Sequence, residues 1–183
     1  MRIVMGVTGG IAAYKACEVV SRLKKLGHEV DVIMTENATR LVAPLTFETL
    51  SKRPVCVDTF TRTESWDVKH ISLAQKAELF LVAPATANLM AKLACGIADD
   101  LLSTTALATT ATLAIAPAAN VHMYEAAATQ ENMATLRRRG VRFIEGGAGY
   151  LACGDVGRGR LADPAVIVRE TLALLAERVG LDA

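Results

Sequence analysis

The chain has 183 residues, of which 52% are hydrophobic and only 4% aromatic, and its formal net charge is +1. This length fits one domain, which we place at residues 1–183, with an aliphatic, alanine-rich core. The nearly neutral charge argues against a protein that binds nucleic acid or another polyanion electrostatically.

The four cysteines, at positions 17, 56, 95 and 153, are far apart in the sequence. They show none of the spacings typical of a metal or redox site, so we expect no bound metal. We also expect no signal peptide and no membrane span, because the first residues lack a charged and apolar leader and no apolar stretch is long enough. A cytoplasmic protein is the simplest interpretation.

The first strand, turn and helix organise the prediction. Residues 2–7 are an apolar, β-branched run, which predicts a buried parallel strand. From residue 12 to residue 26, apolar side chains recur every three or four positions and predict a helix that ends before Gly27. Gly9 and Gly10 lie in the turn between them, where they let a phosphate approach the helix N-terminus closely.

The same turn narrows the kind of phosphate ligand. It lacks the third glycine of a dinucleotide fingerprint, and the second predicted strand, residues 29–34, is followed by Thr35 rather than by an acidic residue. The lysine-serine pair of a P-loop is also missing. A mononucleotide such as FMN therefore fits better than NAD or ATP; the alternative is a tight turn that binds nothing.

The middle of the chain continues the alternation. Thr35 predicts a helix cap, residues 46–50 a short helix and residues 55–57 a weak third strand. Residues 58–69 form a polar loop of a length that is often functional, and a short helix begins at His70.

A second strand-and-helix unit follows. Residues 79–83 predict a buried strand, and in the turn after it Thr86 and Asn88 supply helix caps and ligand hydrogen bonds. Helices are expected at residues 89–94 and 101–108, the second capped by Asp99 or Asp100.

The last third predicts a strand at residues 112–116, a helix at 129–139 and a last strand at 141–144. A glycine-rich loop from Gly146 leads to a final helix that Pro164 opens and that ends near residue 179. Alternating strands and helices indicate a doubly wound parallel sheet, an α/β fold whose ligands bind beyond the carboxyl ends of the strands. The loops at that end begin at Thr8, Thr35, Pro84 and Pro117.

Five segments stand out in this order: VTGGIAAYK, VKHISLAQ, APATANLMAKLACGIADDLLSTTALA, PAAN-x-x-MY and LACGDVGRGRLADP. Together they resemble the phosphopantothenoylcysteine decarboxylases, which belong to the homo-oligomeric flavin-containing cysteine decarboxylases. The resemblance runs from about residue 2 to about residue 170. It implies a flavodoxin-like, Rossmann-like fold of three α/β/α layers, bound FMN, and a homotrimer or a dodecamer of trimers with the active site at a subunit boundary. In many bacteria this domain is fused to a phosphopantothenoylcysteine synthetase domain.

The resemblance also implies a carboxy-lyase reaction. Its small-molecule substrate, 4′-phospho-N-pantothenoylcysteine, is converted with FMN to 4′-phosphopantetheine through thioaldehyde and enethiol intermediates. His70 matches the family's acid/base histidine, Cys153 its proton-donating cysteine, and Asn120 the asparagine that binds the substrate carboxylate and amide. A helix-capping histidine is the alternative for His70. The implied cofactor contacts are Gly9, Gly10, Ile11, Thr35, Thr86, Ala87, Asn88, Ser103 and Ala118, and the implied substrate contacts are Asn120, Met123 and Ala152.

One residue departs from the family pattern. Ala119 stands where the motif usually has methionine, and natural drift, a different substrate and an engineered change each explain it. A smaller residue admits a bulkier substrate, so a peptidyl-cysteine decarboxylase that acts on the C-terminal cysteine of a peptide is one alternative, although Cys153 favours the coenzyme A branch. An FMN-binding regulatory subunit without turnover is a second.

Overall fold

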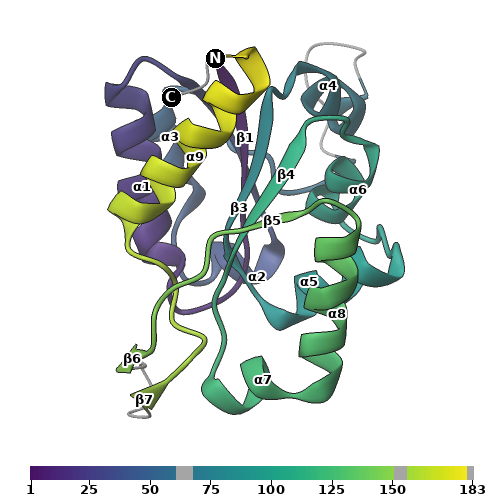
Figure 1. The fold of residues 1–183 in the computed structure, drawn as a ribbon. Coiled ribbons are helices and arrows are strands. Elements are labelled where there is room, and N and C mark those ends of the chain that lie inside the picture. Colours follow the sequence, from purple (N-terminus) through teal and green to yellow (C-terminus); the bar gives the residue numbers. More distant parts are fainter. Residues whose placement is uncertain (61–67, 151–155, 181–183) are drawn as a thin grey trace.

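A computed structural model describes residues 1–60, 68–150 and 156–180 of the chain. Its centre is a five-stranded parallel sheet with the strand order β2-β1-β3-β4-β5 (Figure 1). This is the flavodoxin-like order: β2 lies on one side of β1, and the strands from β3 onward lie on the other side, so the strand order reverses between β1 and β3. The strands are β1 Arg2–Val7, β2 Glu29–Met34, β3 Leu79–Ala85, β4 Thr112–Pro117 and β5 Arg142–Phe143.

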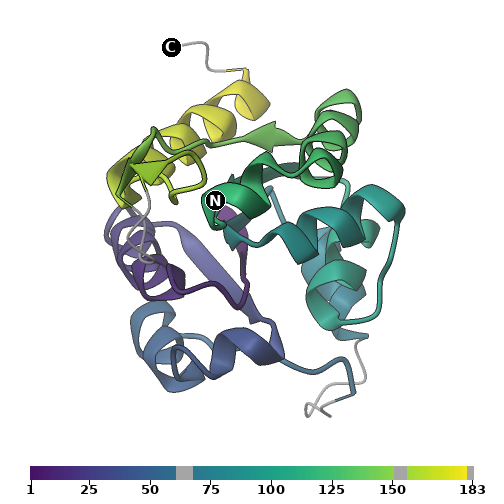
Figure 2. The same cartoon turned by 90° about the horizontal axis from the view of Figure 1, so that it is seen from below.

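Helices cover both faces of the sheet, which confirms the predicted doubly wound, three-layer fold (Figures 1 and 2). One face carries α1 Ala13–Lys25, α3 Pro44–Ser51 and α9 Pro164–Val179, and the other carries α4 Lys69–Lys76, α5 Ala87–Cys95, α6 Leu101–Ala108 and α8 Ala127–Arg138. The short helices α2 Glu36–Thr39 and α7 Val121–Glu125 follow β2 and β4 at the carboxyl end of the sheet. No helix in the described residues is long and apolar enough to cross a membrane.

The core has two halves because side chains of a strand alternate between its faces. Met5 and Leu81 are buried in the half beneath α1 and α9, whereas Val4 and Phe80 are buried in the half beneath α4 and α6. The central strands β1 and β3 are therefore apolar on both sides, which explains their continuous hydrophobic runs.

Several predicted boundaries are confirmed. The strands β1 and β2 and the helix α6 have the predicted bounds, and Pro164 begins α9 as expected. Gly27 follows the end of α1 with a φ of +83°, a conformation that glycine adopts without steric cost. Other ends shift: α3 starts at Pro44, α5 at Ala87 and α8 at Ala127, and β3 extends through Pro84 to Ala85.

The predicted third strand at residues 55–57 is wrong. Only Cys56 bridges the sheet, where its carbonyl accepts a hydrogen bond from Met34 N at 2.9 Å and its amide donates to Val32 O at 3.0 Å. The preceding Pro54 has no amide hydrogen with which to extend the ladder along the edge of β2.

The strand predicted at residues 141–144 is confirmed as the shorter β5, the last strand of the main sheet, but it is not the last strand of the chain. After β5, the chain forms an antiparallel pair, β6 Gly149–Tyr150 and β7 Val156–Gly157, apart from the main sheet. The glycines of this segment lower its strand propensity, so the sequence pattern indicated a loop. The helix α7 was likewise not predicted.

Candidate active site

A buried threonine links the ends of β1 and β3, the two strands between which the strand order of the sheet reverses. Thr8 directly follows β1 and is 1% exposed. Its Oγ1 atom donates a hydrogen bond to Pro84 O at 2.7 Å and accepts one from Thr86 N at 3.0 Å. The ends of β1 and β3 are thus held at a fixed separation, although the sequence analysis did not single out Thr8 as a site residue. The sequence feature that could have identified Thr8 is a hydroxyl side chain between a buried strand and a pair of glycines.

The N-terminus of α1 lies beside this link. Its N-cap residue, Ala12, offers no side-chain hydrogen bond to the first-turn amides, and the first turn has no acidic residue. A Cβ atom on Gly9 would collide with Asn37 of α2, whereas one on Gly10 would meet only Thr86 Cγ2, at 3.5 Å. Gly9 is therefore required by packing, while the space beside Gly10 suits an anion that binds helix amides.

Threonines cap the helices that follow β2 and β3. Thr35 Oγ1 accepts a hydrogen bond from Ala38 N at 3.3 Å, and Thr86 Oγ1 accepts one from Leu89 N at 3.4 Å. The predicted capping role of both residues is confirmed. Since each oxygen is engaged with the backbone, the hydroxyl proton is the part of these side chains that suits a ligand.

Ser103, a predicted cofactor contact, belongs to a capping box in α6. Its Oγ atom donates to Asp100 Oδ1 at 2.9 Å, and Asp100 Oδ1 accepts from Ser103 N at 2.7 Å, so Asp100 is the cap. Burial by itself raises the pKa of Asp100, but hydrogen bonds from Lys92 and Ser103 outweigh it and the pKa is lowered. Contact of Ser103 with a cofactor stays a prediction.

Asn120 follows β4 at the same end of the sheet. Its Oδ1 atom caps α7 by accepting a hydrogen bond from His122 N at 2.9 Å. Two residues earlier, the amide of Ala118 donates a hydrogen bond to Ala85 O at 2.9 Å. This bond ties the segment to the end of β3. Met123 is exposed, whereas Ala119 packs against the core half beneath α4 and α6.

The structure therefore brings Thr35, Thr86 and Asn120 to the carboxyl end of the sheet, where hydrogen bonds link the end of β1 to the ends of β2 and β3, and the end of β3 to that of β4. Ile11, Ala87 and Asn88 lie in the helix starts at that end. Ala152 and Cys153 lie outside the described residues.

His70 is placed differently. It is half-buried in α4, and its Nδ1 atom is buried without a hydrogen-bond partner among the described residues. Figure 1 shows α4 near the end of the sheet where β1 begins, whereas α2 and α7 lie at the opposite end. The chain thus does not bring His70 beside Asn120, and the helix-capping alternative for His70 is not seen, since α4 has no side-chain cap.

Several exposed apolar side chains lie at the start of α4 and on the helix beside it. Leu107 of α6, the helix that packs beside α4, is 63% exposed, and Val68 and Ile71 at the start of α4 are exposed as well. Within the described part of the chain, no group of three or more histidine, cysteine or acidic side chains could hold a metal ion.

Comparison with known proteins assigns the chain to a family. Residues 1–176 match the model of the family described as Flavoprotein. The chain is 53% identical over 167 residues to the coenzyme A biosynthesis bifunctional protein CoaBC of Bacillus subtilis, covering 91% of this chain and 41% of that protein. It is 48% identical over 178 residues to CoaBC of Mycobacterium tuberculosis, covering 97% and 42%. The chain thus spans about two fifths of the length of these relatives.

Solved structures share the whole fold. The FMN-dependent cysteine decarboxylase SpaF superimposes with a TM-score of 0.85 at 29% identity, covering 98% of this chain and 97% of that one. A PPC decarboxylase mutant complexed with pantothenoylaminoethenethiol also has a TM-score of 0.85, at 27% identity, with coverages of 96% and 98%.

Proposed function

The chain belongs to the Flavoprotein family, and from that premise we propose that it binds FMN and decarboxylates 4′-phospho-N-pantothenoylcysteine to 4′-phosphopantetheine. The observation that carries this proposal is the strong identity to bifunctional coenzyme A biosynthesis proteins across a chain whose strand-end loops converge on one edge. We further propose that residues 1–183 form one decarboxylase domain, that a synthetase domain is fused to it in the full-length protein, and that this protein is cytoplasmic.

The edge between β1 and β3 fits a flavin mononucleotide. In this proposal the first-turn amides of α1, beside Gly10, bind its phosphate, and the hydroxyl groups of Thr35 and Thr86 donate to its polar atoms. When bound, FMN supplies the reversible two-electron oxidation of the cysteine moiety that makes loss of carbon dioxide easy.

The other steps belong to side chains of this protein. Asn120 binds the substrate carboxylate and amide, for which an amide side chain offers both an acceptor and donors. His70 transfers a proton at its imidazole ring, and Cys153 donates the last proton from its thiol.

We propose that a second copy of the chain completes the site, in a homotrimer or a dodecamer of trimers. The support is the placement of α4 far from α7 in one chain, together with the exposed apolar side chains of Val68, Ile71 and Leu107 at the start of α4 and on the neighbouring α6. Contact through this surface would bury the apolar groups and bring His70 to a neighbour's edge.

A peptide substrate is the second candidate. The small side chain of Ala119, which leaves room for a bulkier substrate, favours it. An FMN-binding regulatory subunit is supported only by the likeness to the FMN binding protein AtHal3, at 27% identity and a TM-score of 0.81.

Mass spectrometry of the products tests the proposal. FMN-loaded protein and phosphopantothenoylcysteine should give the saturated thiol with loss of carbon dioxide. No product with flavin bound would overturn it, and activity on a peptide with a C-terminal cysteine would establish the alternative. Ala119→Met separates a changed substrate from a weakened site, because only a weakened site should regain turnover of the small substrate. Cys153→Ser should release carbon dioxide but stop at the enethiol.

A further inference from the structure

Tyr124 occupies a central place in the segment that carries Asn120. It is 6% exposed, and its ring packs in the core half on the sheet face that carries α4, α5, α6 and α8. Its amide donates to Asn120 O at 2.8 Å, and its carbonyl accepts a hydrogen bond from Gln130 Nε2 at 2.6 Å. The turn that presents Asn120 is therefore closed on Tyr124.

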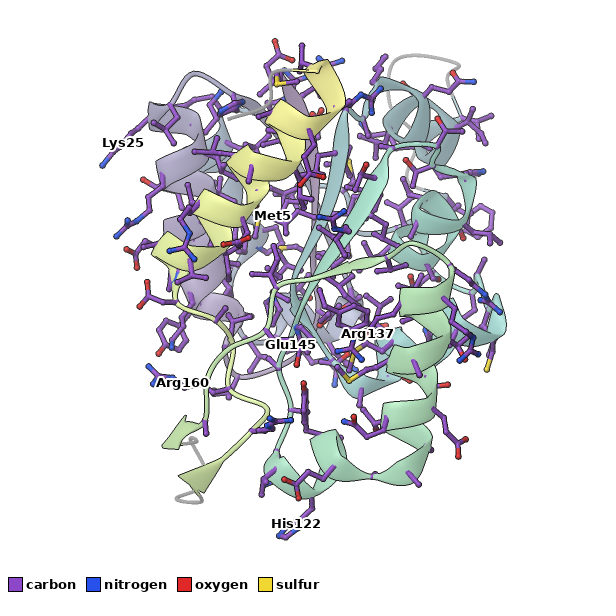
Figure 3. All side chains as sticks on the ribbon, viewed as in Figure 1. Met5, Lys25, His122, Arg137, Glu145 and Arg160 are labelled. Carbon is purple, nitrogen blue, oxygen red and sulfur yellow. The ribbon has the colours of Figure 1, made fainter. Side chains whose placement is uncertain are left out.

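The phenol of Tyr124 donates a hydrogen bond to a carboxylate. Its hydroxyl donates to Glu145 Oε2 at 2.6 Å, and Arg137 Nη2 donates to Glu145 Oε1 at 2.5 Å. The Arg137 guanidinium in turn lies over the ring of Phe143, 4.3 Å from its centre. Figure 3 shows Arg137 and Glu145 side by side between α8 and the strand end after β5.

Both partners keep the protonation states that this hydrogen bond needs. Burial, together with the hydrogen bond to Glu145, raises the pKa of Tyr124 to about 12. Burial also acts to raise the pKa of Glu145, but the hydrogen bonds from Tyr124 and Arg137 outweigh it and lower that pKa. A protonated phenol therefore faces an ionised carboxylate at neutral pH, and such charge-assisted bonds are the strong ones.

The segment after β7 rests on the same two residues. Gly159, with a φ of +107°, lies so close that an added Cβ atom would be 3.1 Å from Tyr124 Cβ and 2.5 Å from Ala119 O. Ala119 N also donates to Gly159 O at 2.9 Å, and the backbone of Glu145 bridges that of Leu161. Tyr124 touches one side of this segment, and Glu145 pairs with it on the other.

Resting on the proposed function, in which Asn120 binds the substrate, we propose that Tyr124 is a positioning residue. Through its hydrogen bond to Glu145 it fixes the Asn120 segment, residues 117–124, against residues 157–161, which lead out of the β6–β7 pair. Tyr124 touches neither substrate nor cofactor in this role; it sets the place from which Asn120 acts.

Two variants test the hydrogen bond without emptying the core. Tyr124→Phe removes the donor and keeps the ring, and Glu145→Gln keeps the shape but offers one oxygen acceptor for two donors. Glu177→Gln is the matched control, because Glu177 also pairs with an arginine, Arg142, at 3.3 Å on an exposed surface away from Asn120.

Amide hydrogen exchange on the FMN-loaded protein gives a readout that needs no turnover. In both variants, residues 117–124 and 157–161 should exchange about tenfold faster or more, while β1 and the control variant keep the wild-type rates. Unchanged exchange in both segments would overturn the proposal, even if the wild-type protein proves to be an active decarboxylase. Faster exchange in an inactive wild-type protein would support the positioning and contradict only the proposed function.

Kinetics then separate positioning from plain destabilisation. Turnover per bound flavin should fall about tenfold or more in either variant, with the affinity for FMN unchanged, since small displacements of a binding group cost rate. The double variant should be no worse than the poorer single variant, because both remove one bond. Additive losses, or wild-type turnover per bound flavin, would contradict the role of Tyr124.

Discussion

At the carboxyl end of the sheet, four polar side chains bond to the backbone of their own chain, whereas the flank formed by α4 and α6 holds one buried polar atom without a partner in the described residues. Thr8, Thr35, Thr86 and Asn120 each hydrogen-bond to the backbone, but the Nδ1 atom of His70 is buried without a partner in the described residues. Val68 and Ile71, close to His70 in the chain, and Leu107 of the neighbouring helix α6 are exposed apolar side chains. Under the proposed homo-oligomer, folding of one chain assembles the carboxyl end of the sheet, and association of copies covers the flank.

The largest effect should come from His70→Asn, which removes the imidazole ring and keeps a polar side chain. Decarboxylation should fall by about 10²- to 10⁴-fold, the usual contribution of acid/base catalysis, while the flavin stays bound. Product analysis and the flavin absorbance measure the two effects. Full turnover would remove His70 from the mechanism.

The same variant sharpens the comparison between edge and flank. Mixed oligomers of His70→Asn and Asn120→Ala chains should recover about a quarter of the activity if each site combines two copies in a closed ring. Each variant alone should stay inactive. If both residues act within one chain, a mixture of the inactive variants gains nothing.

Leu107→Glu should break the association itself. Burying a leucine in an interface contributes about 1.5–3 kcal/mol, so a charge at this 63%-exposed position should weaken the oligomer at least tenfold. Analytical ultracentrifugation measures the change. Leu26→Glu is the control, since Leu26 is also exposed but lies at the end of α1. Equal effects of both substitutions would mean that the flank is not special.

Thr8→Val should destabilise the link between the ends of β1 and β3 at the carboxyl end of the sheet. The substitution leaves Pro84 O without the hydroxyl donor and Thr86 N without its acceptor in a buried place, so the free energy of unfolding should fall by about 1–3 kcal/mol. Urea unfolding measures it. Thr49→Val is the comparison, because the Thr49 hydroxyl bonds to Leu45 O on an exposed helix, and little change is expected there.

The smallest effect concerns pH. The pKa of Asp100 is lowered from its usual 3.8, so its stabilisation is present above that value and is lost as the pH falls through the folded-state pKa. Asp100→Asn keeps a cap but loses the charge beside Lys92, at 2.8 Å. The variant should be roughly 0.5–1 kcal/mol less stable at pH 7, and the difference should shrink below about pH 4. A constant difference at all pH values would exclude the ion pair as its source.

The sequence predicted most of the framework because its signals are local. The apolar run of β1, the periodic helix α1 and the cap at Asp100 each depend on neighbouring residues, and all were confirmed. The family membership expected from the five motifs was confirmed as well.

What the sequence did not predict depends on contacts between distant residues. The pairing of β6 with β7 and the bond from Tyr124 to Glu145, 21 positions apart, leave no periodic trace. The composition of residues 55–57 predicted a strand, but only Cys56 pairs with β2 in the structure. The placement of His70 follows from where α4 packs, which its motif does not reveal. The roles of the predicted site residues stay predictions.

The Thr8 link also bears on the thermodynamics of ligand binding. Since its hydroxyl fixes the gap between the ends of β1 and β3 during folding, a ligand that enters there finds the backbone already ordered. Conformational entropy that a flexible site loses on binding is lost here when the chain folds. Calorimetry should then show only a small ordering penalty for the wild-type protein and a larger one for Thr8→Val.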